Sequence, residues 1–480
     1  MCSQFFLVCF WQALTRLYAV ISRILYDSDF RSKREPPLDK GVIPWLGHAL
    51  DFGKDAAKFL TRMKLKHGDI FTVRVAGRYV TVLLDPHSYD SVLQDTTSLD
   101  FTHYAQVLMD RIFNLRLPNH KPDSEKAIMK RHFHGESLSC LNHNMQNHLQ
   151  TLLMFETTAT QNQTDWKHDG LFGFCYSLLF RAGYLTLFGG EQNNNCTDAA
   201  KVYKEYQKFD SLLIKMARTT LKSEKQTAGS VKQRLWELLA QAGQRENSSL
   251  WLQSYRQHLE QEGADEETQR KAMLLQLWAT QNRSQQHSTP PGLRHVRQKV
   301  VSGKAYRKIH LTSAIDYSAL EETLRLTAAP FITREVLQNK TLHMADGQEY
   351  DLRRGDRVCL FPFISPQMDP EIHHKPEQFK YDRFLNADGT AKEDFFKSGR
   401  RLKYYTMPWG AGTNACVGKP FAVQSIRQFV FLVLSHLNIE LSDSEAQVPA
   451  VDASRYGFGM VQPIKELPIR YKLRERSNLQ

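Results

Sequence analysis

The chain has 480 residues, and its 63 lysines and arginines against 51 acidic residues give a formal net charge of +12. Apolar residues make up 41% and charged residues 24% of the chain, which excludes intrinsic disorder, a collagen-like sequence and a polytopic membrane protein. The seven cysteines form an odd, scattered set, so they are not a disulfide framework and favour a reducing compartment.

The N-terminal residues are apolar and are predicted to attach the chain to a membrane. Residues 5–11 form an apolar run, and apolar residues up to position 25 keep helical spacing. A spanning helix needs about 20 mostly apolar residues, so residues 1–28 are predicted to be an uncleaved anchor that is tilted or lies in the interface. The alternative is a terminal amphipathic helix packed on its own domain. Basic residues and a proline pair in the linker 29–40 favour the anchor and a cytosol-facing domain.

The positive charge is concentrated in one stretch of the chain. Between Arg283 and Ile315 there are seven lysines and arginines and no acidic residue, which is more than half of the net excess. The rest of the chain is close to neutral and has no basic stripe interleaved with aromatic residues. This distribution argues against a nucleic-acid partner.

The predicted elements are mainly helices, with a small β component. Residues 70–84 alternate around Ala76-Gly77 as in a hairpin, and a second hairpin is expected from Thr341 to Leu352, turning at Asp346-Gly347. Most of the stretch from 88 to 281 has helical periodicity broken by polar loops. We therefore expect a mainly α fold with a small β part (α+β), in one catalytic domain from 41 to 480.

The segment from Pro408 to Gly418 carries the most informative chemistry. Glycines at 410, 412 and 418 surround Cys416, and a strongly apolar helix follows. These glycines let the backbone turn tightly, and the helix N-terminus favours a thiolate over a thiol. A lone buried cysteine is usually a small hydrophobic residue, but a thiolate in such a loop suits an axial haem ligand.

A second constellation precedes that cysteine in the chain. Glu322 and Arg325 lie three residues apart, which places both on one face of a helix that ends before Pro330. Arg383 could complete a buried ionic triad with them. An acid and a base three apart would by themselves indicate only a solvated helix face, but the order of all three ahead of Cys416 is specific.

With these two constellations the sequence resembles the cytochrome P-450 superfamily of haem-thiolate enzymes, over nearly the whole chain from residue 41 to 476. The resemblance implies that fold, haem b (iron protoporphyrin IX) as cofactor and Cys416 as the ligand of its iron. Glu322, Arg325 and Arg383 would be structural. The residues implied to bind the cofactor are Cys416, Trp409, Gly410, Asn414 and Gly418.

Two departures from the usual family pattern narrow the expected activity. Trp409 stands where most members have phenylalanine, and Asn414 stands where most have an arginine that pairs with a haem propionate. Both resemble the branch that isomerises the prostaglandin H endoperoxide to prostacyclin by homolytic O–O cleavage. That branch needs no reductase, and its place is the endoplasmic reticulum membrane. The alternatives are a sterol 12α-hydroxylase-like monooxygenase and an inactive haem-binding variant.

The same resemblance implies a set of substrate-binding residues. Its arginines could form charge-assisted bonds to a haem propionate or to the substrate carboxylate, although a surface arginine in a loop is the alternative. The set comprises Arg111, Leu117, Asn282, Thr333, Arg334, Arg357 and Phe458, with Asn282 also carried over as a catalytic residue.

The helix expected to cross the distal face of the haem departs most from the family. Residues 266–281 match its first half, but the chain then becomes polar, and the prolines and glycine at 290–292 would end any helix. Residues 283–315 are therefore predicted to be an atypical segment that replaces the rest of this helix. Asn282 is one position out of register with the asparagine that contacts the endoperoxide. No acid–threonine pair occurs near Thr280, which disfavours a monooxygenase.

Overall fold

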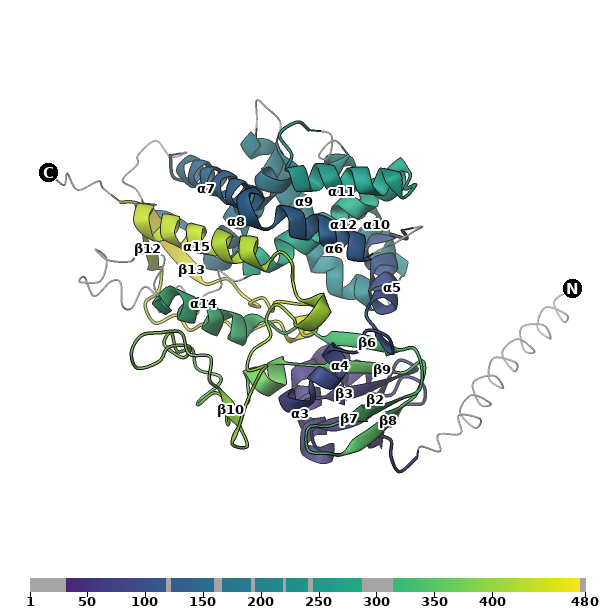
Figure 1. Cartoon of the computed structure of the whole chain (residues 1–480). Helices are drawn as coiled ribbons and strands as arrows, with labels where there is room; N and C mark the ends of the chain where they lie inside the picture. Colours follow the sequence, from purple (N-terminus) through teal and green to yellow (C-terminus); the bar gives the residue numbers. More distant parts are fainter. Residues whose placement is uncertain are drawn as a thin grey trace, which may run out of the picture. The chain divides into compact units, whose positions relative to one another are not determined.

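The chain forms two compact units, seen here in a computed structural model (Figure 1). One unit, called the β unit below, comprises residues up to Asp100 together with Thr333–Leu360. The other, called the helical unit, comprises Phe101–Ile332 and the chain from Phe361 onward. The predicted single domain thus has two parts, and its mainly helical character is confirmed. The structure describes residues 32–117, 122–158, 166–190, 195–218, 222–240, 245–286 and 314–474.

The β unit is built on a six-stranded sheet with the order β1-β2-β3-β9-β6-β4. Strand β1 lies inside the stretch predicted to be a linker, because residues 38 and 39 pair in parallel with β2. The bounds in this unit are β1 Leu38–Asp39, α2 Ala49–Lys54, α3 Ala56–His67, β2 Ile70–Val75, β3 Arg78–Leu83, η1 Pro86–Ser88, α4 Asp90–Leu93, β4 Leu99–Asp100, β6 Ile332–Val336, β7 Lys340–His343, β8 Glu349–Leu352 and β9 Arg357–Leu360.

Both predicted hairpins are present in the β unit. Strands β2 and β3 pair antiparallel, and the two residues between them, Ala76 and Gly77, both have positive φ angles, of 49° and 76°. A two-residue turn of this kind matches the twist of the strands that it joins. Strands β7 and β8 form the second hairpin, with Gly347 at φ 87° in its turn.

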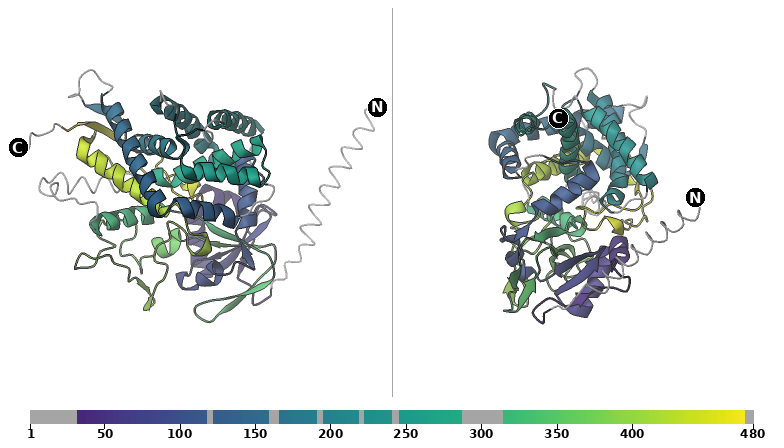
Figure 2. Two further views of the ribbon diagram at one scale, coloured as in Figure 1. Left: turned by 45° about the horizontal axis from the view of Figure 1, so that its top comes forward. Right: turned by 90° about the vertical axis from the view of Figure 1, so that its right-hand side faces the viewer.

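The helical unit consists of long helices and two small sheets (Figures 1 and 2). Strands β12, β13 and β5 form one antiparallel sheet. The bounds are α5 Thr102–Phe113, α6 Pro122–His132, α7 Gly135–Thr158, β5 Lys167–Gly170, α8 Leu171–Phe188, α9 Asn195–Ala217, α10 Lys222–Leu239, α11 Leu250–Gln261, α12 Glu266–Gln286, α14 Ala314–Thr327, η4 Phe363–Gln367, β10 Phe396–Lys397, β11 Arg400–Arg401, η5 Gly412–Asn414, α15 Lys419–His436, β12 Leu437–Leu441, η6 Ala453–Arg455 and β13 Pro468–Leu473.

Helix α8 is the central core helix of this unit. Within the described part of the chain it is the one helix long and apolar enough to span a membrane, yet 83% of its residues are buried inside the protein. A helix that is apolar all round is buried in a core or a membrane, and α8 packs against α7, α9 and α12. The predicted anchor, residues 1–28, lies outside the described residues.

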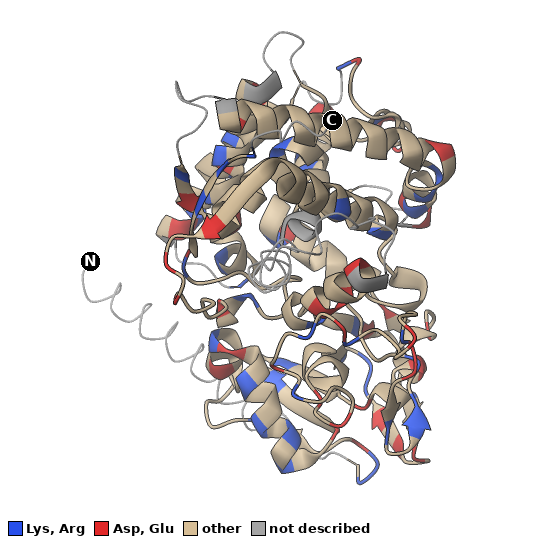
Figure 3. Ribbon diagram, turned by 90° about the vertical axis from the view of Figure 1, so that its left-hand side faces the viewer, with Lys and Arg blue, Asp and Glu red and all other residues tan. Residues whose placement is uncertain are grey.

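Helix α12 positions the site, because it packs against α5, α8, α10 and α15. It ends at Gln286, so the helix continues for four residues into the segment 283–315 that was expected to replace it. The pair of prolines expected to end it lies outside the described part of the chain. Along the described helices and strands, basic and acidic residues are interspersed (Figure 3).

Candidate active site

The cysteine loop leads directly into α15 and holds Cys416 three residues before that helix begins. Gly410 and Gly412 have φ angles of 68° and 67°, values that side chains with a Cβ rarely adopt. The backbone N–H of Cys416 donates to the carbonyl of Trp409 over 2.9 Å, which closes the loop. The thiol of Cys416 is thereby held at the positive end of the helix dipole.

Cys416 lies in the wall of a cavity of about 460 Å³ within the helical unit. The walls are mostly aromatic and aliphatic: Phe113 comes from the end of α5, Trp278 from α12, and Phe331 from the chain after α14. Phe458 comes from the turn that follows η6. Four segments far apart in sequence therefore enclose the cysteine in an apolar space, which is typical of ligand and cofactor sites.

The wall formed by Phe331 depends on a glycine in the facing turn. Gly457 has a φ angle of 95°, and a Cβ built on it would lie 2.2 Å from the ring of Phe331. The N–H of Phe331 donates to the carbonyl of Gly457 over 3.2 Å, and the N–H of Gly457 donates to the carbonyl of Ala329 over 2.8 Å. The turn can therefore approach the ring only without a side chain at this position.

A few polar groups face the same cavity. Lys126 of α6 donates from Nζ to Oδ1 of Asn414 over 2.9 Å, and both residues line the cavity. The indole Nε1 of Trp278 is buried without a hydrogen-bond partner among the described residues. Thr280 donates its hydroxyl to the carbonyl of Gln276 on its own helix over 2.7 Å. The cavity thus offers a cation and an amide at the cysteine loop.

The ionic triad is assembled beneath the cysteine loop. Arg325 donates from Nε and Nη2 to the carboxylate of Glu322 over 2.7 and 2.9 Å, and Arg383 donates from Nε over 2.8 Å. Glu322 and Arg325 are fully buried. Burial lowers the pKa of Arg383, and the charge of Glu322 opposes that shift. The structure therefore brings together three residues that the sequence separates by up to 61 positions.

Hydrogen bonds connect this triad to the cysteine loop. Arg325 donates from Nη1 to the carbonyl of Gln367 over 2.6 Å. The side-chain amide of Gln367 donates to the carbonyls of Arg325 and Ala328, and its oxygen accepts from the N–H of Met407 over 3.4 Å. Met407 in turn accepts a hydrogen bond from the N–H of Gly410 over 3.2 Å. The triad thus fixes the position at which the loop begins.

Two of the expected substrate residues lie away from this cavity. Arg111 is exposed on α5, whose residues at the cavity are Ala105, Leu108, Met109, Ile112 and Phe113. Leu117 lines a smaller hollow of about 280 Å³ beside α5 instead. The lining residues of α5 form one helical face, and position 111 lies beyond the edge of that face.

The remaining expected residues are divided between the two units. Trp409, Asn414, Gly418 and Phe458 line the cavity together with Cys416. Asn282 lies in α12, but its side chain is outside the part of the chain that the structure describes.

Three expected substrate residues belong to the β unit. Thr333 is buried in β6 and donates to the sulfur of Cys359 over 3.9 Å. Arg334 is 4% exposed, and burial lowers its pKa. Arg357 begins β9 and is half-buried.

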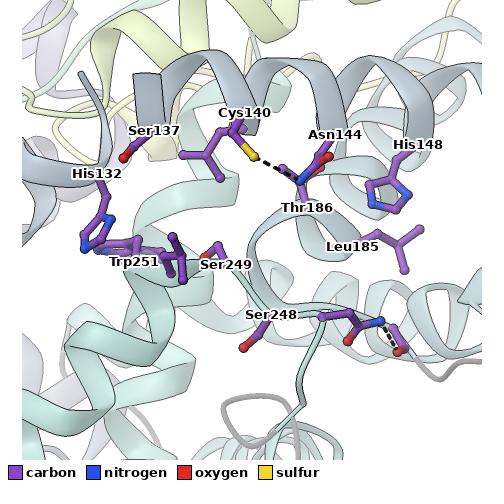
Figure 4. A pocket seen from close by; sticks show the side chains of 14 residues that line it. His132, Ser137, Cys140, Asn144, His148, Leu185, Thr186, Ser248, Ser249 and Trp251 are labelled. Carbon is purple, nitrogen blue, oxygen red and sulfur yellow. Dashed lines mark hydrogen bonds between the residues drawn. The ribbon is translucent and has the colours of Figure 1, made fainter. Parts of the chain in front are cut away.

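A second cavity of about 400 Å³ lies elsewhere in the helical unit and contains another free cysteine (Figure 4). Cys140 lies on the exposed surface of α7, and Asn144 of the same helix donates to its sulfur over 3.9 Å. His132 and His148 also line this cavity, but the described residues contain no cluster of three side chains able to bind a metal. Unlike Cys416, Cys140 lies within a helix and is not part of a glycine-rich loop before one.

The sequence did not indicate Lys126 or Phe331 as residues of the site. Lys126 is one of several basic residues of α6, and such a run is typical of a solvated helix face. Its partner Asn414 lies 288 positions later in the chain. Phe331 follows the helix that carries Glu322 and Arg325, and the adjacent Pro330 was expected only to end that helix.

Comparison with known proteins agrees with this geometry. The family model described as Cytochrome P450 matches residues 36–302 and 294–469. Prostacyclin synthase of Rattus norvegicus is 49% identical over 500 residues, covering 97% of this chain and 99% of that protein, and the Homo sapiens protein is 49% identical with the same coverage.

More distant proteins share the fold. The 7-alpha-hydroxycholest-4-en-3-one 12-alpha-hydroxylase of Homo sapiens is 38% identical over 92% of this chain and 93% of its own length. The solved structure of retinoic acid bound cyanobacterial CYP120A1 covers 92% of this chain and 100% of its own, with a TM-score of 0.70 at 16% sequence identity. The arrangement of helices and small sheets described above is therefore that of these proteins.

Proposed function

The chain belongs to the cytochrome P450 family, and from this premise we propose that it is a haem-thiolate isomerase that converts prostaglandin H to prostacyclin. The family's cofactor is haem, and the similar proteins named for this activity match nearly the entire chain. The observation that carries the proposal is Cys416, which lies on a glycine-rich turn before α15 and lines an apolar cavity.

The residues around the cavity fit a haem group. Cys416 would ligate the iron, and Gly418 lines the same cavity beside it. The aromatic walls suit a flat apolar macrocycle. Lys126 and Asn414, bonded to each other at the cavity wall, provide the polar groups that a propionate needs.

When bound, the haem supplies an iron centre that can cleave an O–O bond homolytically without electrons from a reductase. The chain's own residues hold and shield the substrate. Phe113, Trp278 and Phe458 form apolar walls that exclude water from a reactive intermediate. Orientation and exclusion of water are thus the contribution of the protein.

The polar residues of α12 favour an isomerase over an oxygen-activating enzyme. Thr280 donates its hydroxyl to Gln276 of its own helix, and its neighbours are Ala279 and Gln281. Gln281 is 1% exposed, and its amide lies against Gly183 of α8, where a Cβ would be 2.5 Å from Oε1. No carboxylate adjoins Thr280 in the sequence to form the acid–threonine pair of a proton relay.

A second proposal is that the chain is a haem-binding variant without isomerase activity. The two segments that match the family model overlap at residues 294–302 instead of running on continuously. This overlap falls within the segment 283–315, which we propose to be an atypical replacement for the end of the distal helix. A sterol monooxygenase rests on weaker similarity, at 38% identity.

Product analysis tests the isomerase directly. Purified haem-loaded protein is mixed with prostaglandin H without NADPH or a reductase, and the hydrolysis product of prostacyclin is measured. We expect product from the wild-type protein and none from C416A. Normal haem binding without any product would instead support the inactive variant, and turnover of a sterol only with NADPH, oxygen and a reductase would support the monooxygenase.

The state of the thiolate has its own test. The reduced carbon monoxide complex of the wild-type protein should show the absorption band of a thiolate-ligated haem, and C416A should lose that band. An unchanged spectrum in C416A would show that another residue binds the iron.

We propose the endoplasmic reticulum membrane as the location, with the catalytic part facing the cytosol. The support is the apolar N-terminal stretch 1–28, the basic residues that follow it and a lipid substrate, which the similar proteins imply. Fractionation of full-length protein, with protease protection of tags at each end, tests both the membrane and the orientation. A soluble tagged protein would contradict the anchor.

A further inference from the structure

The second cavity, which contains Cys140, has the size of a small-molecule site. Its volume is about 400 Å³, and such sites usually measure about 300 to 1,000 Å³. Its walls come from α7, the end of α8 and the residues that lead into α11 (Figure 4). Cys140 and Asn144 of α7 line the cavity and are exposed, so it opens to solvent along that helix. A molecule can therefore enter it from outside.

One face of α7 supplies a polar wall. Cys140, Asn144 and His148 line the cavity at intervals of four residues, which places them on the same face of the helix (Figure 4). The side-chain amide of Asn144 donates to the sulfur of Cys140 over 3.9 Å. His148 has no hydrogen-bond partner within the described part of the chain, and neither of its ring nitrogens is among the polar atoms that are buried without a partner. Its imidazole therefore retains accessible nitrogens that can form hydrogen bonds.

The wall at the start of α11 is held by hydrogen bonds of its own. Ser249 donates from Oγ to the carbonyl of Leu187 over 2.9 Å and accepts from the N–H of Leu252 over 3.3 Å. Asn247 donates from Nδ2 to the carbonyl of Gly190 over 2.8 Å. These bonds tie the residues before α11 to the end of α8, so these two walls are fixed relative to each other.

The chemistry of the lining favours an uncharged ligand. None of the described residues that line the cavity is a lysine, arginine, aspartate or glutamate. Burial lowers the pKa of His148, so its imidazole is mostly neutral at pH 7 and has one donor and one acceptor nitrogen. Leu141, Leu185 and Trp251 add buried apolar side chains. An ionic ligand would lose hydration here without gaining a counter-charge, whereas an apolar body would be stabilised.

The end of α6 separates this cavity from the one that contains Cys416. His132 lines the second cavity, whereas the next residue, Phe133, lines the first. Trp251 of the second cavity packs against Phe133, with ring centroids 5.4 Å apart and an interplanar angle of 78°. No described residue lines both cavities. A ligand of the second cavity therefore does not compete with one bound at Cys416.

We propose that the second cavity binds a neutral small molecule with an apolar body and a hydroxyl group, and that His148 forms the hydrogen bond to this hydroxyl. A hydroxyl fits because it can either donate to or accept from a neutral imidazole. The inference goes beyond the proposed isomerase and is independent of it, since it uses none of the residues at Cys416.

Protection of Cys140 tests the site. Haem-loaded protein is saturated with an azole that ligates the iron, 2-naphthalenemethanol is added, and the alkylation rate of Cys140 by iodoacetamide is followed by mass spectrometry of its peptide. We expect the alcohol to slow alkylation severalfold at saturation, and its concentration dependence gives a dissociation constant. The matched anion 2-naphthoate has the same rings but a carboxylate, and it should leave the rate unchanged.

Two variants and a hydrocarbon test the hydrogen bond. H148F keeps a flat ring but removes both nitrogens, and it should raise the dissociation constant of the alcohol about fivefold, the usual effect of losing one hydrogen bond. The analogue 2-methylnaphthalene lacks the hydroxyl and should bind wild-type protein and H148F equally, which would show that the cavity is intact. H143F replaces an exposed histidine of α7 that does not line the cavity, and should leave the affinity for the alcohol unchanged.

The outcomes separate the two parts of the proposal. If 2-naphthalenemethanol does not slow the alkylation of Cys140, or if 2-naphthoate protects it equally well, the cavity is not a site for a neutral ligand. If H148F weakens the alcohol and the hydrocarbon to the same degree, His148 only shapes the wall and the hydrogen bond is refuted. Product formation from prostaglandin H is measured separately, so failure of the isomerase proposal would leave this result unaffected.

Discussion

Replacing Glu322 with glutamine should destabilise the protein more than almost any other single isosteric change. Its carboxylate accepts four hydrogen bonds, three from the two arginines of the triad and one from the N–H of Lys380 over 2.9 Å. Both the carboxylate and the guanidinium of Arg325 have no exposed surface, and the side chain of Arg383 is 6% exposed. E322Q therefore leaves two buried cations without their counterion.

The cost of that change can be estimated from the burial of the triad. Removing one partner of a buried ion pair typically costs about 3 to 5 kcal/mol. This is a large part of the total stability of a folded protein, which is about 5 to 15 kcal/mol. Because the triad also bonds to Gln367 and through it to Met407, the cysteine loop should loosen as well. We therefore expect E322Q to lose haem as well as stability.

The neighbouring residue provides a matched control. Glu321 is 6% exposed, and burial raises the pKa of its carboxyl. E321Q exchanges a carboxyl of raised pKa for an amide of similar shape and should cost about 1 kcal/mol or less. Both variants are unfolded in urea, and circular dichroism and haem absorbance are followed together. Equal urea midpoints for E321Q and E322Q would refute the reasoning.

Three further predictions address the cavity and the pH dependence. K126M removes an ammonium from the cavity wall and should weaken haem binding several-fold, by about 1 kcal/mol, in a haem-transfer assay. G457A should lower the free energy of unfolding by about 1 to 3 kcal/mol more than G347A does. Both glycines have positive φ angles, but only a Cβ at position 457 would clash with Phe331. Equal losses of stability in the two variants would contradict this clash. Burial lowers the pKa of His373 from 6.5 to about 3, so the unfolded chain takes up a proton that the folded protein does not. The free energy of unfolding should therefore decrease as the pH is lowered from about 6.5 to 3, by at most about 1.4 kcal/mol per pH unit. In H373Q this decrease should be smaller when urea unfolding is measured at each pH.

The sequence was sufficient to predict the two hairpins, because each turn is specified by residues that are adjacent in the chain. Ala76-Gly77 and Asp346-Gly347 specify two-residue turns through backbone preferences of the residues themselves, and both hairpins formed at those positions. The glycines around Cys416 and the apolar helix behind it are likewise continuous in the chain. The order of the triad residues before the cysteine indicated the family, whose model matches most of the chain.

Local periodicity could not determine which face of a helix meets the cavity. Arg111 and Phe113 lie two positions apart on α5, and only the packing of that helix exposes the first and turns the second inward. Helix α12 reaches Gln286, four residues into the segment predicted to be atypical, and the rest of that segment up to residue 313 lies outside the described part of the chain.

What the sequence by itself determined is the local setting of Cys416, because the surrounding glycines and the apolar helix that follows are contiguous in the chain. What only the tertiary structure decided is which charges accompany it. Lys126 meets Asn414 across 288 positions, and Arg383 meets Glu322 across 61. Contacts over such separations follow from how helices pack around a shared core, and no local pattern of residues encodes them.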